Sequence, residues 1–226
     1  MRGSVPCMNR LAEDVFQLPL MPRDAINAYL IGDVLVDAGT AGSAKRILRE
    51  IHGHAVTAHT ITHAHIDHVG GSKKVVDALD IPMWAPAGDA AAVEAGKPDA
   101  ADNRMKPVAS QSGWRPVPVA RRLHEGDEVG PGFVVLDVPG HSPGHVAYWR
   151  ESDRILICGD VFFHMSLLTL RPKLREPIGA FTNDPALNRA SMRRLAALRP
   201  ELVLVGHGVP LRDPDALSAF AAQLPA

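Results

Sequence analysis

Short apolar runs alternate with helix-like segments along the chain, and this alternation is its strongest structural signal. Residues 26–31 and 34–37 predict a β-hairpin that turns at Gly32-Asp33. Seven more short runs, apolar or alternating, predict further strands at residues 55–62, 81–85, 117–123, 133–138, 145–149, 154–158 and 202–205. Strands and helices mixed in this way predict a layered α/β architecture.

Helices are predicted between several of these strands. Ser43 stands where it can cap a helix, residues 67–79 have helical apolar spacing, and residues 90–95 form a shorter helical segment. Asp184 and Asp213 each precede a proline, which pairs a capping acid with proline at the first helical position. Two helices are therefore expected to begin there.

Two stretches predict loops. Residues 86–117 are rich in Ala, Pro and Gly, and outside the short helix they lack a clear pattern. Residues 161–182 combine Pro and Gly with basic side chains and predict a loop that caps an active site. We find no repeat or charged linker, so residues 1–226 predict a single domain.

Composition narrows the functional classes. A formal net charge of −1 over 226 residues gives no support for a nucleic-acid partner. No apolar stretch has the length of a membrane span or signal peptide, so we expect a cytoplasmic protein without a membrane partner. The two cysteines, Cys7 and Cys158, are too few for a disulfide framework, and Cys158 is expected to be a small buried apolar residue.

The densest group of chemically active side chains lies directly after a predicted strand. His63, His65 and Asp67 alternate, so in extended backbone they point to one side, while His68 opens the next helix and points elsewhere. Imidazoles and a carboxylate suit zinc, iron or manganese. The Gly-Gly pair at 70–71 allows another backbone segment to approach closely. Such density argues against unrelated surface histidines.

Three later positions complete a candidate metal site. His141, Asp160 and His207 each follow a glycine just beyond a predicted strand, where α/β folds gather their active residues. Singly, an aspartate at a strand end is more often a turn residue, but as a set these positions favour metal binding. His145 recurs in the loop of His141, where it is expected to orient that loop.

The order of these motifs resembles the metallo-β-lactamase superfamily over roughly residues 14–210. The matching residues are Asn27, Tyr29, Asp37-Ala38-Gly39, residues 63–68, Pro139-Gly140-His141, Gly159-Asp160 and Gly206-His207. The resemblance implies an α/β (α+β) fold, a four-layer αβ/βα sandwich with its site along one edge of the two sheets. It further implies a first metal ion on His63, His65 and His141, a second on Asp67, His68 and His207, and Asp160 bridging both.

The resemblance also implies a dinuclear metal-dependent hydrolase with two divalent ions, zinc by expectation and iron or manganese as alternatives. A hydroxide bridging the ions would cleave an ester, thioester or lactone of a small molecule. Asp67 and Asp160 would take part in catalysis, and Asp37 and His145 would hold the ligands in place.

Departures from particular branches refine this expectation. Only 19 residues follow His207, so we expect no C-terminal glutathione-binding region of the glyoxalase II kind. A bridging Asp160 argues against a β-lactam as the natural substrate. Many lactonase members carry a tyrosine three residues after the bridging aspartate, where this chain has Phe163, so His164 or a backbone amide is expected to take that role.

Residues 161–182 are expected to border the substrate pocket, with Phe163, His164 and Arg171 as candidate lining residues. Core packing explains the apolar residues of this loop equally well, and a solvated loop explains its basic residues. Two rival functions stay open, a phosphodiesterase or nuclease-type member and a mononuclear iron oxygenase of the persulfide dioxygenase kind. We expect a small-molecule substrate and leave a homodimer open.

Overall fold

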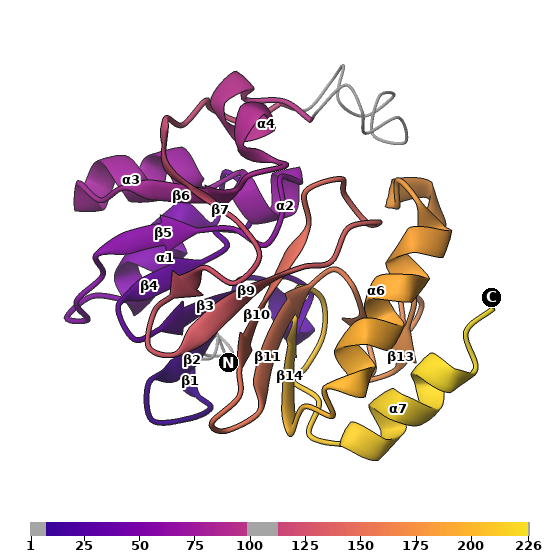
Figure 1. Ribbon diagram of the computed structural model, residues 1–226. Coiled ribbons are helices and arrows are strands. Elements are labelled where there is room, and N and C mark those ends of the chain that lie inside the picture. Colours follow the sequence, from indigo (N-terminus) through magenta and orange to yellow (C-terminus); the bar gives the residue numbers. More distant parts are fainter. Residues whose placement is uncertain (1–7, 99–112, 226) are drawn as a thin grey trace.

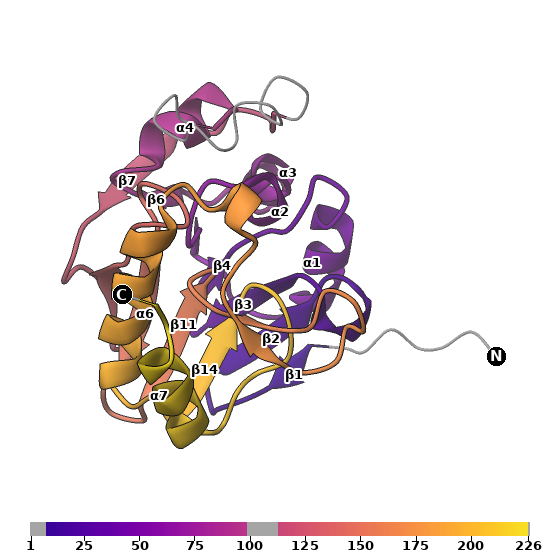
Figure 2. The same ribbon diagram turned by 90° about the vertical axis from the view of Figure 1, so that its right-hand side faces the viewer.

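The computed structural model describes residues 8–98 and 113–225. Two β-sheets face each other, and helices cover the outer face of each sheet, as Figures 1 and 2 show from two directions. This is the four-layer αβ/βα sandwich that the sequence predicted. Cys7 and part of the loop predicted at 86–117 lie outside the described residues.

The first sheet has seven strands in chain order, antiparallel from β1 to β4 and parallel from β4 to β7. They are β1 (Asn9–Arg10), β2 (Val15–Pro19), β3 (Asn27–Ile31), β4 (Val34–Val36), β5 (Ala58–Thr60), β6 (Met83–Pro86) and β7 (Val119–Leu123). β3 and β4 form the predicted hairpin, and Gly32 takes the positive φ of 56° at its turn. β4 and β5 run parallel, so the segments that follow them emerge at the same edge.

The second sheet has five strands in the order β14-β11-β10-β9-β8. They are β8 (Glu128–Val129), β9 (Phe133–Asp137), β10 (Val146–Arg150), β11 (Ile155–Gly159) and β14 (Leu202–Val205). β11 and β14 are parallel neighbours, so the residues after them also leave the sheet side by side.

Helices occupy the two outer layers (Figure 1). Those beside the first sheet are α1 (Ala44–Glu50), α2 (Ile66–Val69), α3 (Ser72–Leu79) and α4 (Ala90–Ala95), and those beside the second are α6 (Pro185–Ala197) and α7 (Pro214–Ala222). Two 3₁₀ turns, η1 (Pro22–Asp24) and η2 (Gly179–Phe181), lie in connecting segments. No helix in the described ranges is long and apolar enough to cross a membrane.

Strand periodicity divides the apolar side chains between the layers. Tyr29 of β3 and Tyr148 of β10 belong to the core between the two sheets, whereas Leu30 packs in the layer of α1 and Trp149 in that of α6 and α7. Successive residues of a strand point to opposite faces, so a sheet covered on both sides needs apolar residues at every position. Cys158 is fully buried beneath α6 and α7, as predicted.

A partly buried ion pair ties the two sheets at one end. The guanidinium of Arg150, at the end of β10, donates to Asp14 just before β2 at 2.7 and 2.9 Å and to Asp153 at 2.7 and 2.9 Å. It also lies 4.5 Å from the ring centroid of Phe133. Fork-like donors of this kind suit two carboxylates at once.

The helix predicted over 67–79 is divided into α2 and α3. The Gly71 N–H donates to the Gly39 carbonyl at 3.2 Å, outside the helical ladder. A Cβ at Gly71 would overlap the Ala38 carbonyl oxygen, and one at Gly70 would lie 2.8 Å from the Ala41 nitrogen. The glycine pair therefore permits the close backbone approach that the sequence predicted.

Other elements differ from prediction in detail. The strand predicted over 55–62 is confined to β5, and β2 was not predicted because its apolar run is short and ends in proline. Asp184 and Asp213 cap their helices as predicted, at 2.9 and 2.8 Å. Ser43 precedes α1, but its hydroxyl lies 3.4 Å from Thr40 and makes no cap. The loop 161–182 contains one small pair of strands, β12 (Phe163–His164) and β13 (Leu174–Arg175).

Candidate metal centre

The seven side chains proposed as metal ligands meet at one edge of the two sheets. Four of them follow β5 in the first sheet, and three follow β9, β11 and β14 in the second. Their nitrogen and oxygen atoms form three overlapping groups, within each of which these atoms lie within 4.8 Å of one another. The groups are His63, His65 and His141; His63, His68 and Asp160; and Asp67, His68 and His207.

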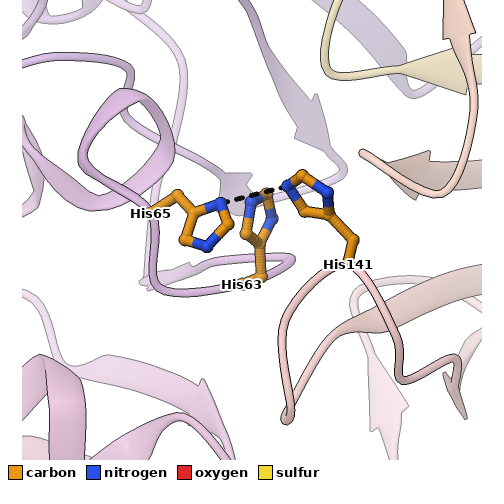
Figure 3. A group of neighbouring side chains, drawn as sticks. All are labelled: His63, His65 and His141. Atoms are coloured by element: carbon orange, nitrogen blue, oxygen red, sulfur yellow. Dashed lines mark hydrogen bonds between the residues drawn. The ribbon is translucent and has the colours of Figure 1, made fainter. Parts of the chain in front are cut away.

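The first cluster consists of three histidine rings that point toward one another (Figure 3). His65 Nδ1 lies 3.0 Å from His141 Nε2, and the His63 ring centroid lies 4.5 and 4.9 Å from those of His65 and His141. His63 and His65 come from the loop after β5, and His141 reaches them from the second sheet. Its contact with His65 joins positions 76 residues apart in the chain.

The second cluster, formed by Asp67, His68 and His207, corrects the prediction that Asp67 points to the same side as His63 and His65. Extended backbone would have placed Asp67 on the same side as His63 and His65, but β5 ends at Thr60 and Asp67 lies in the first turn of α2. There its carboxylate lies 3.3 Å from His207 Nε2, in the group that also contains His68. The turn into the helix separates the two clusters.

Asp160 lies between the clusters and contacts both. Its Oδ2 is 3.4 Å from His141 Nε2 and 3.1 Å from His207 Nε2, and its Oδ1 is 3.3 Å from His68 Nε2. Gly206 makes room for this carboxylate, because a Cβ there would overlap Asp160 Oδ1 and lie 2.7 Å from His68 Cε1.

Hydrogen bonds on the outer side of four rings fix which nitrogen faces the site. Nδ1 of His63 bonds to Thr62 Oγ1 at 3.1 Å, and Nδ1 of His68 bonds to Asp37 Oδ2 at 2.9 Å. Nδ1 of His141 bonds to Thr182 Oγ1 at 3.3 Å, and Nδ1 of His207 bonds to the Ala25 carbonyl at 2.6 Å. These Nδ1 atoms donate, because Asp37 and Ala25 only accept and both threonine hydroxyls donate elsewhere. Nε2 of each of these four rings therefore faces the centre, where it can serve as the ligand atom.

Burial and the attraction between neighbouring groups set the charge states of the histidines and of Asp160 at the site. Burial lowers the pKa of His63 and His141 well below the usual value, so both rings are neutral. Burial alone would raise the pKa of Asp160 and lower that of His207. Their mutual attraction prevails, so the pKa of Asp160 is lowered and the pKa of His207 is raised to about 10. A divalent ion would replace the proton on His207 beside the ionised Asp160.

Among the described residues, His63 Nε2 has no hydrogen-bond partner, and the buried His68 Nε2 and Asp160 Oδ1 lie 3.3 Å apart without forming a hydrogen bond. Buried polar atoms are rarely left without partners, since each costs desolvation free energy. Converging imidazole nitrogens and carboxylate oxygens match the donor set of zinc or iron. The residues present therefore fit a metal centre.

Asp37 and His145 contact the clusters from behind. Asp37 follows β4, adopts a positive φ of 62°, and accepts hydrogen bonds from the Thr62 backbone N–H at 2.7 Å and from His68. Such backbone strain persists only where the surroundings impose it. His145 Nε2 accepts from the Asp160 N–H at 3.1 Å, and its ring stacks on His63 with centroids 4.5 Å apart.

The first hairpin fastens the loop of His207. The Asn27 side chain donates to the Val205 and Gly208 carbonyls at 3.1 and 2.8 Å, and the Tyr29 hydroxyl donates to the Val205 carbonyl at 2.7 Å. A ligand of the second sheet is thereby held by side chains of the first.

Asp89, just before α4, was missed by sequence reasoning. Its buried carboxylate accepts from the Ala64 N–H at 2.7 Å, the Gly144 N–H at 2.9 Å and the Ser142 hydroxyl at 3.1 Å. It thus joins the two loops that carry the first cluster. The available signal was a Gly-Asp pair directly after a strand, as at Gly159-Asp160, but it lay in a weakly patterned region.

A cavity of about 370 Å³ opens beside the clusters. It is lined by five cluster residues and by Ile66, Phe163, Met165, Leu167, Ile178 and Phe181. Phe163 was a predicted lining residue. His164 does not line the cavity, since its Nδ1 bonds to the Val209 carbonyl at 2.8 Å, and neither does Arg171, which is exposed.

Comparison with known proteins gives the family. A family model for the metallo-beta-lactamase superfamily matches residues 21–207. The chain is 28% identical over 200 residues to the probable metallo-hydrolase YflN of Bacillus subtilis (strain 168), which covers 79% of this chain and 76% of that protein. It is 35% identical over 133 residues to a hydroxyacylglutathione hydrolase of Bdellovibrio bacteriovorus, covering 58% of this chain but only 43% of that protein.

Solved structures agree. TTHA1623, crystallised in a di-iron-bound form, superposes with a TM-score of 0.68 at 31% identity, covering 92% of this chain and 97% of that one. BLEG-1 B3 metallo-beta-lactamase superposes with a TM-score of 0.65 at 27% identity, covering 87% and 93%. The chain therefore belongs to the metallo-β-lactamase superfamily and is a metal-dependent hydrolase.

Proposed function

We propose that this protein is a dinuclear hydrolase that cleaves an ester, thioester or lactone of a small molecule. The observation that carries the proposal is the position of Asp160, whose carboxylate contacts histidines of both clusters. One ion would be held by His63, His65 and His141, a second by Asp67, His68 and His207, with Asp160 shared between them.

Two divalent ions held there would supply a hydroxide nucleophile at neutral pH, because a metal lowers the pKa of bound water from 15.7 to about 7. Asp160 keeps the two ligand clusters at a fixed separation. Asp67 lines the cavity, and although burial raises its pKa, the hydrogen bond with His207 prevails and lowers it, so its ionised carboxylate is placed to accept a hydrogen bond from the nucleophile and orient it. The outward Nδ1 bonds keep the imidazoles oriented throughout.

The relatives support this proposal. TTHA1623 was solved with two irons, which favours a two-metal centre and keeps iron beside zinc as the candidate metal. Hydroxyacylglutathione hydrolase is named for cleavage of an acyl compound, and this chain spans less than half of that relative. A cytoplasmic location, a small-molecule substrate and the absence of a nucleic-acid partner stay predictions from the sequence.

Elemental analysis followed by a substrate panel tests the proposal. About two ions per chain and turnover of thioesters, lactones or aryl esters are expected, with both lost in Asp160→Ala. His52→Ala, which removes an exposed histidine away from the clusters, serves as the control. One iron per chain with consumption of oxygen would favour the oxygenase instead, and turnover of phosphodiesters alone would favour the nuclease class.

A further inference from the structure

We infer that the cavity binds the acyl chain of the substrate and selects chains that are uncharged and apolar. The enzyme therefore accepts neutral acyl compounds and rejects those that carry a charge at the far end of the acyl chain. The inference rests on the proposed function, because it concerns the substrate of the same centre. It adds a substrate class that the ligand clusters alone do not define.

The composition of the cavity wall carries the inference. Outside the ligand clusters, every lining residue is apolar: Ile66, Phe163, Met165, Leu167, Ile178 and Phe181. Among the described residues that line it there is no lysine, arginine, amide or hydroxyl side chain. Apolar walls gain free energy from buried hydrocarbon but offer a charged group no partner.

The apolar surface extends from the centre to the mouth of the cavity. The Phe163 ring centroid lies 4.5 Å from that of His207, and Phe163 is only 5% exposed, so its ring forms part of the wall beside the ligands. Leu167 and Phe181 are 41% and 40% exposed and line the same cavity at its rim. An acyl chain whose carbonyl lies at the centre can therefore contact hydrocarbon along its length.

One wall of the cavity is fixed directly to a ligand of the centre. The Thr182 hydroxyl donates to the Ile178 carbonyl at 3.0 Å and accepts from His141 Nδ1 at 3.3 Å. The Asn183 N–H also donates to the His141 carbonyl at 3.1 Å. Contacts with Ile178 and Phe181 thus position a substrate relative to His141, and a preformed wall avoids the cost of ordering it.

The cations of the same loop lie elsewhere. Lys173 and Arg175 line a neighbouring groove with Phe220 and Leu224 of the α7 region, which shares only Leu167 with the cavity, and the Arg175 Nε donates to the Glu176 carbonyl. Arg171 is exposed and outside the cavity lining. A carboxylate at the far end of an acyl chain would therefore be desolvated in the cavity without a counter-charge.

The test uses the metal-loaded enzyme with thioesters of acetate, butyrate and hexanoate, and with the hexanoyl compound carrying a terminal carboxylate. kcat/KM is expected to rise about fourfold for each added methylene, the value of one buried CH₂. The terminal carboxylate is expected to lower kcat/KM about a hundredfold relative to hexanoyl.

Variants at the rim localise the effect. Leu167→Arg introduces a cation, so it should reduce the discrimination against the terminal carboxylate about tenfold. Phe181→Ala removes apolar wall, so kcat/KM should rise less with each added methylene. Leu187→Ala, at a leucine 43% exposed in the first turn of α6 and outside the cavity, should change neither. Calorimetry with 2-butanone and 2-octanone, which have no bond to cleave, should show tighter binding of the longer ketone.

The outcomes separate this inference from the proposed function. A flat chain-length series in an enzyme that turns over the acetyl thioester would overturn the inference and leave the proposed function standing. No turnover of any acyl compound by fully metal-loaded protein would overturn the proposed function, and equal binding of the two ketones would then overturn the inference as well.

Discussion

At the scale of single residues, Gly206 controls the space for the Asp160 carboxylate. Its φ is not in the left-handed region, so alanine fits the backbone there, but its Cβ would overlap Asp160 Oδ1. Gly206→Ala is expected to weaken metal binding and activity about 10–100-fold, as displaced supporting groups usually do, and to lower stability by about 1–3 kcal/mol. Metal titration and kcat measure this.

Gly42→Ala provides the matched control for this substitution. Gly42 is exposed, and the nearest atom to a Cβ there would be Thr40 Oγ1 at 3.8 Å, an ordinary contact. Metal binding by Gly42→Ala should equal that of the unmodified protein. Equal behaviour of the two variants would contradict the argument from space.

His59 gives the fold a pH dependence separate from the metal. Burial lowers the pKa of His59 from 6.5 to about 4, and its ring bonds to the Leu35 carbonyl and the Ser72 hydroxyl. Below pH 6.5 the unfolded chain binds a proton that the folded protein does not bind until about pH 4. This contribution to stability is therefore lost as the pH falls, by about 2 kcal/mol between pH 7 and 5.

Urea unfolding of the protein and of His59→Gln between pH 7 and 5 measures this contribution. Other titrating groups are common to both proteins, so the difference in unfolding free energy should shrink by about 2 kcal/mol toward pH 5. His52→Gln, at an exposed histidine, should parallel the unmodified protein. A constant difference between the protein and His59→Gln would refute the assignment to His59.

At the scale of elements, the start of α4 supports the metal centre instead of capping its own helix. The Asp89 side chain makes no cap bond within α4 and instead joins the loops of Ala64 and Gly144. Asp89→Ala leaves buried N–H groups without acceptors, so it should lower stability by about 1–3 kcal/mol and metal affinity about 10–100-fold. Calorimetric metal titration reports the affinity.

Asp213→Ala isolates an ordinary helix cap for comparison. Asp213 caps α7 through the Ala216 N–H at 2.8 Å. Its removal should cost about 1 kcal/mol of stability and leave metal affinity unchanged. If both variants lose metal affinity to the same degree, the loss reflects general destabilisation and the role assigned to Asp89 is wrong.

At the scale of the whole molecule, the metal centre is a link between the two sheets. The segment after β5 of the first sheet supplies His63, His65, Asp67 and His68, and the segments after three strands of the second sheet supply the other candidate ligands. Ions that bind only the folded state stabilise it, by about 4 kcal/mol at a free concentration a thousand times the dissociation constant. Chelation should therefore lower the unfolding temperature markedly.

Thermal unfolding with and without chelator, repeated on Asp160→Asn, tests this link. The variant should lose most of the metal-dependent shift, because the shared carboxylate becomes a weaker neutral ligand. The Arg150–Asp14 pair would still join the sheets at its own position. Equal unfolding temperatures of the metal-loaded and chelated protein would contradict a structural role for the ions.

The sequence alone predicted the layers and the candidate ligand residues. Apolar runs of strand length and helix-start signals such as Asp184 and Asp213 are local, because each depends only on which positions of one short segment are buried or cap a helix. The density of ligand residues from His63 to His68, and glycines before Asp160 and His207, likewise need no tertiary information.

Only the tertiary structure decided how those residues combine. It placed Asp67 beside His207, against the alternation along the chain and in agreement with the family resemblance, brought Asp89 against Gly144 across 55 positions, and directed Lys173 away from the cavity. The physical reason is that periodicity records which side of an element faces the core. Distances between loops from different sheets depend on strand order and loop packing, which no local pattern contains.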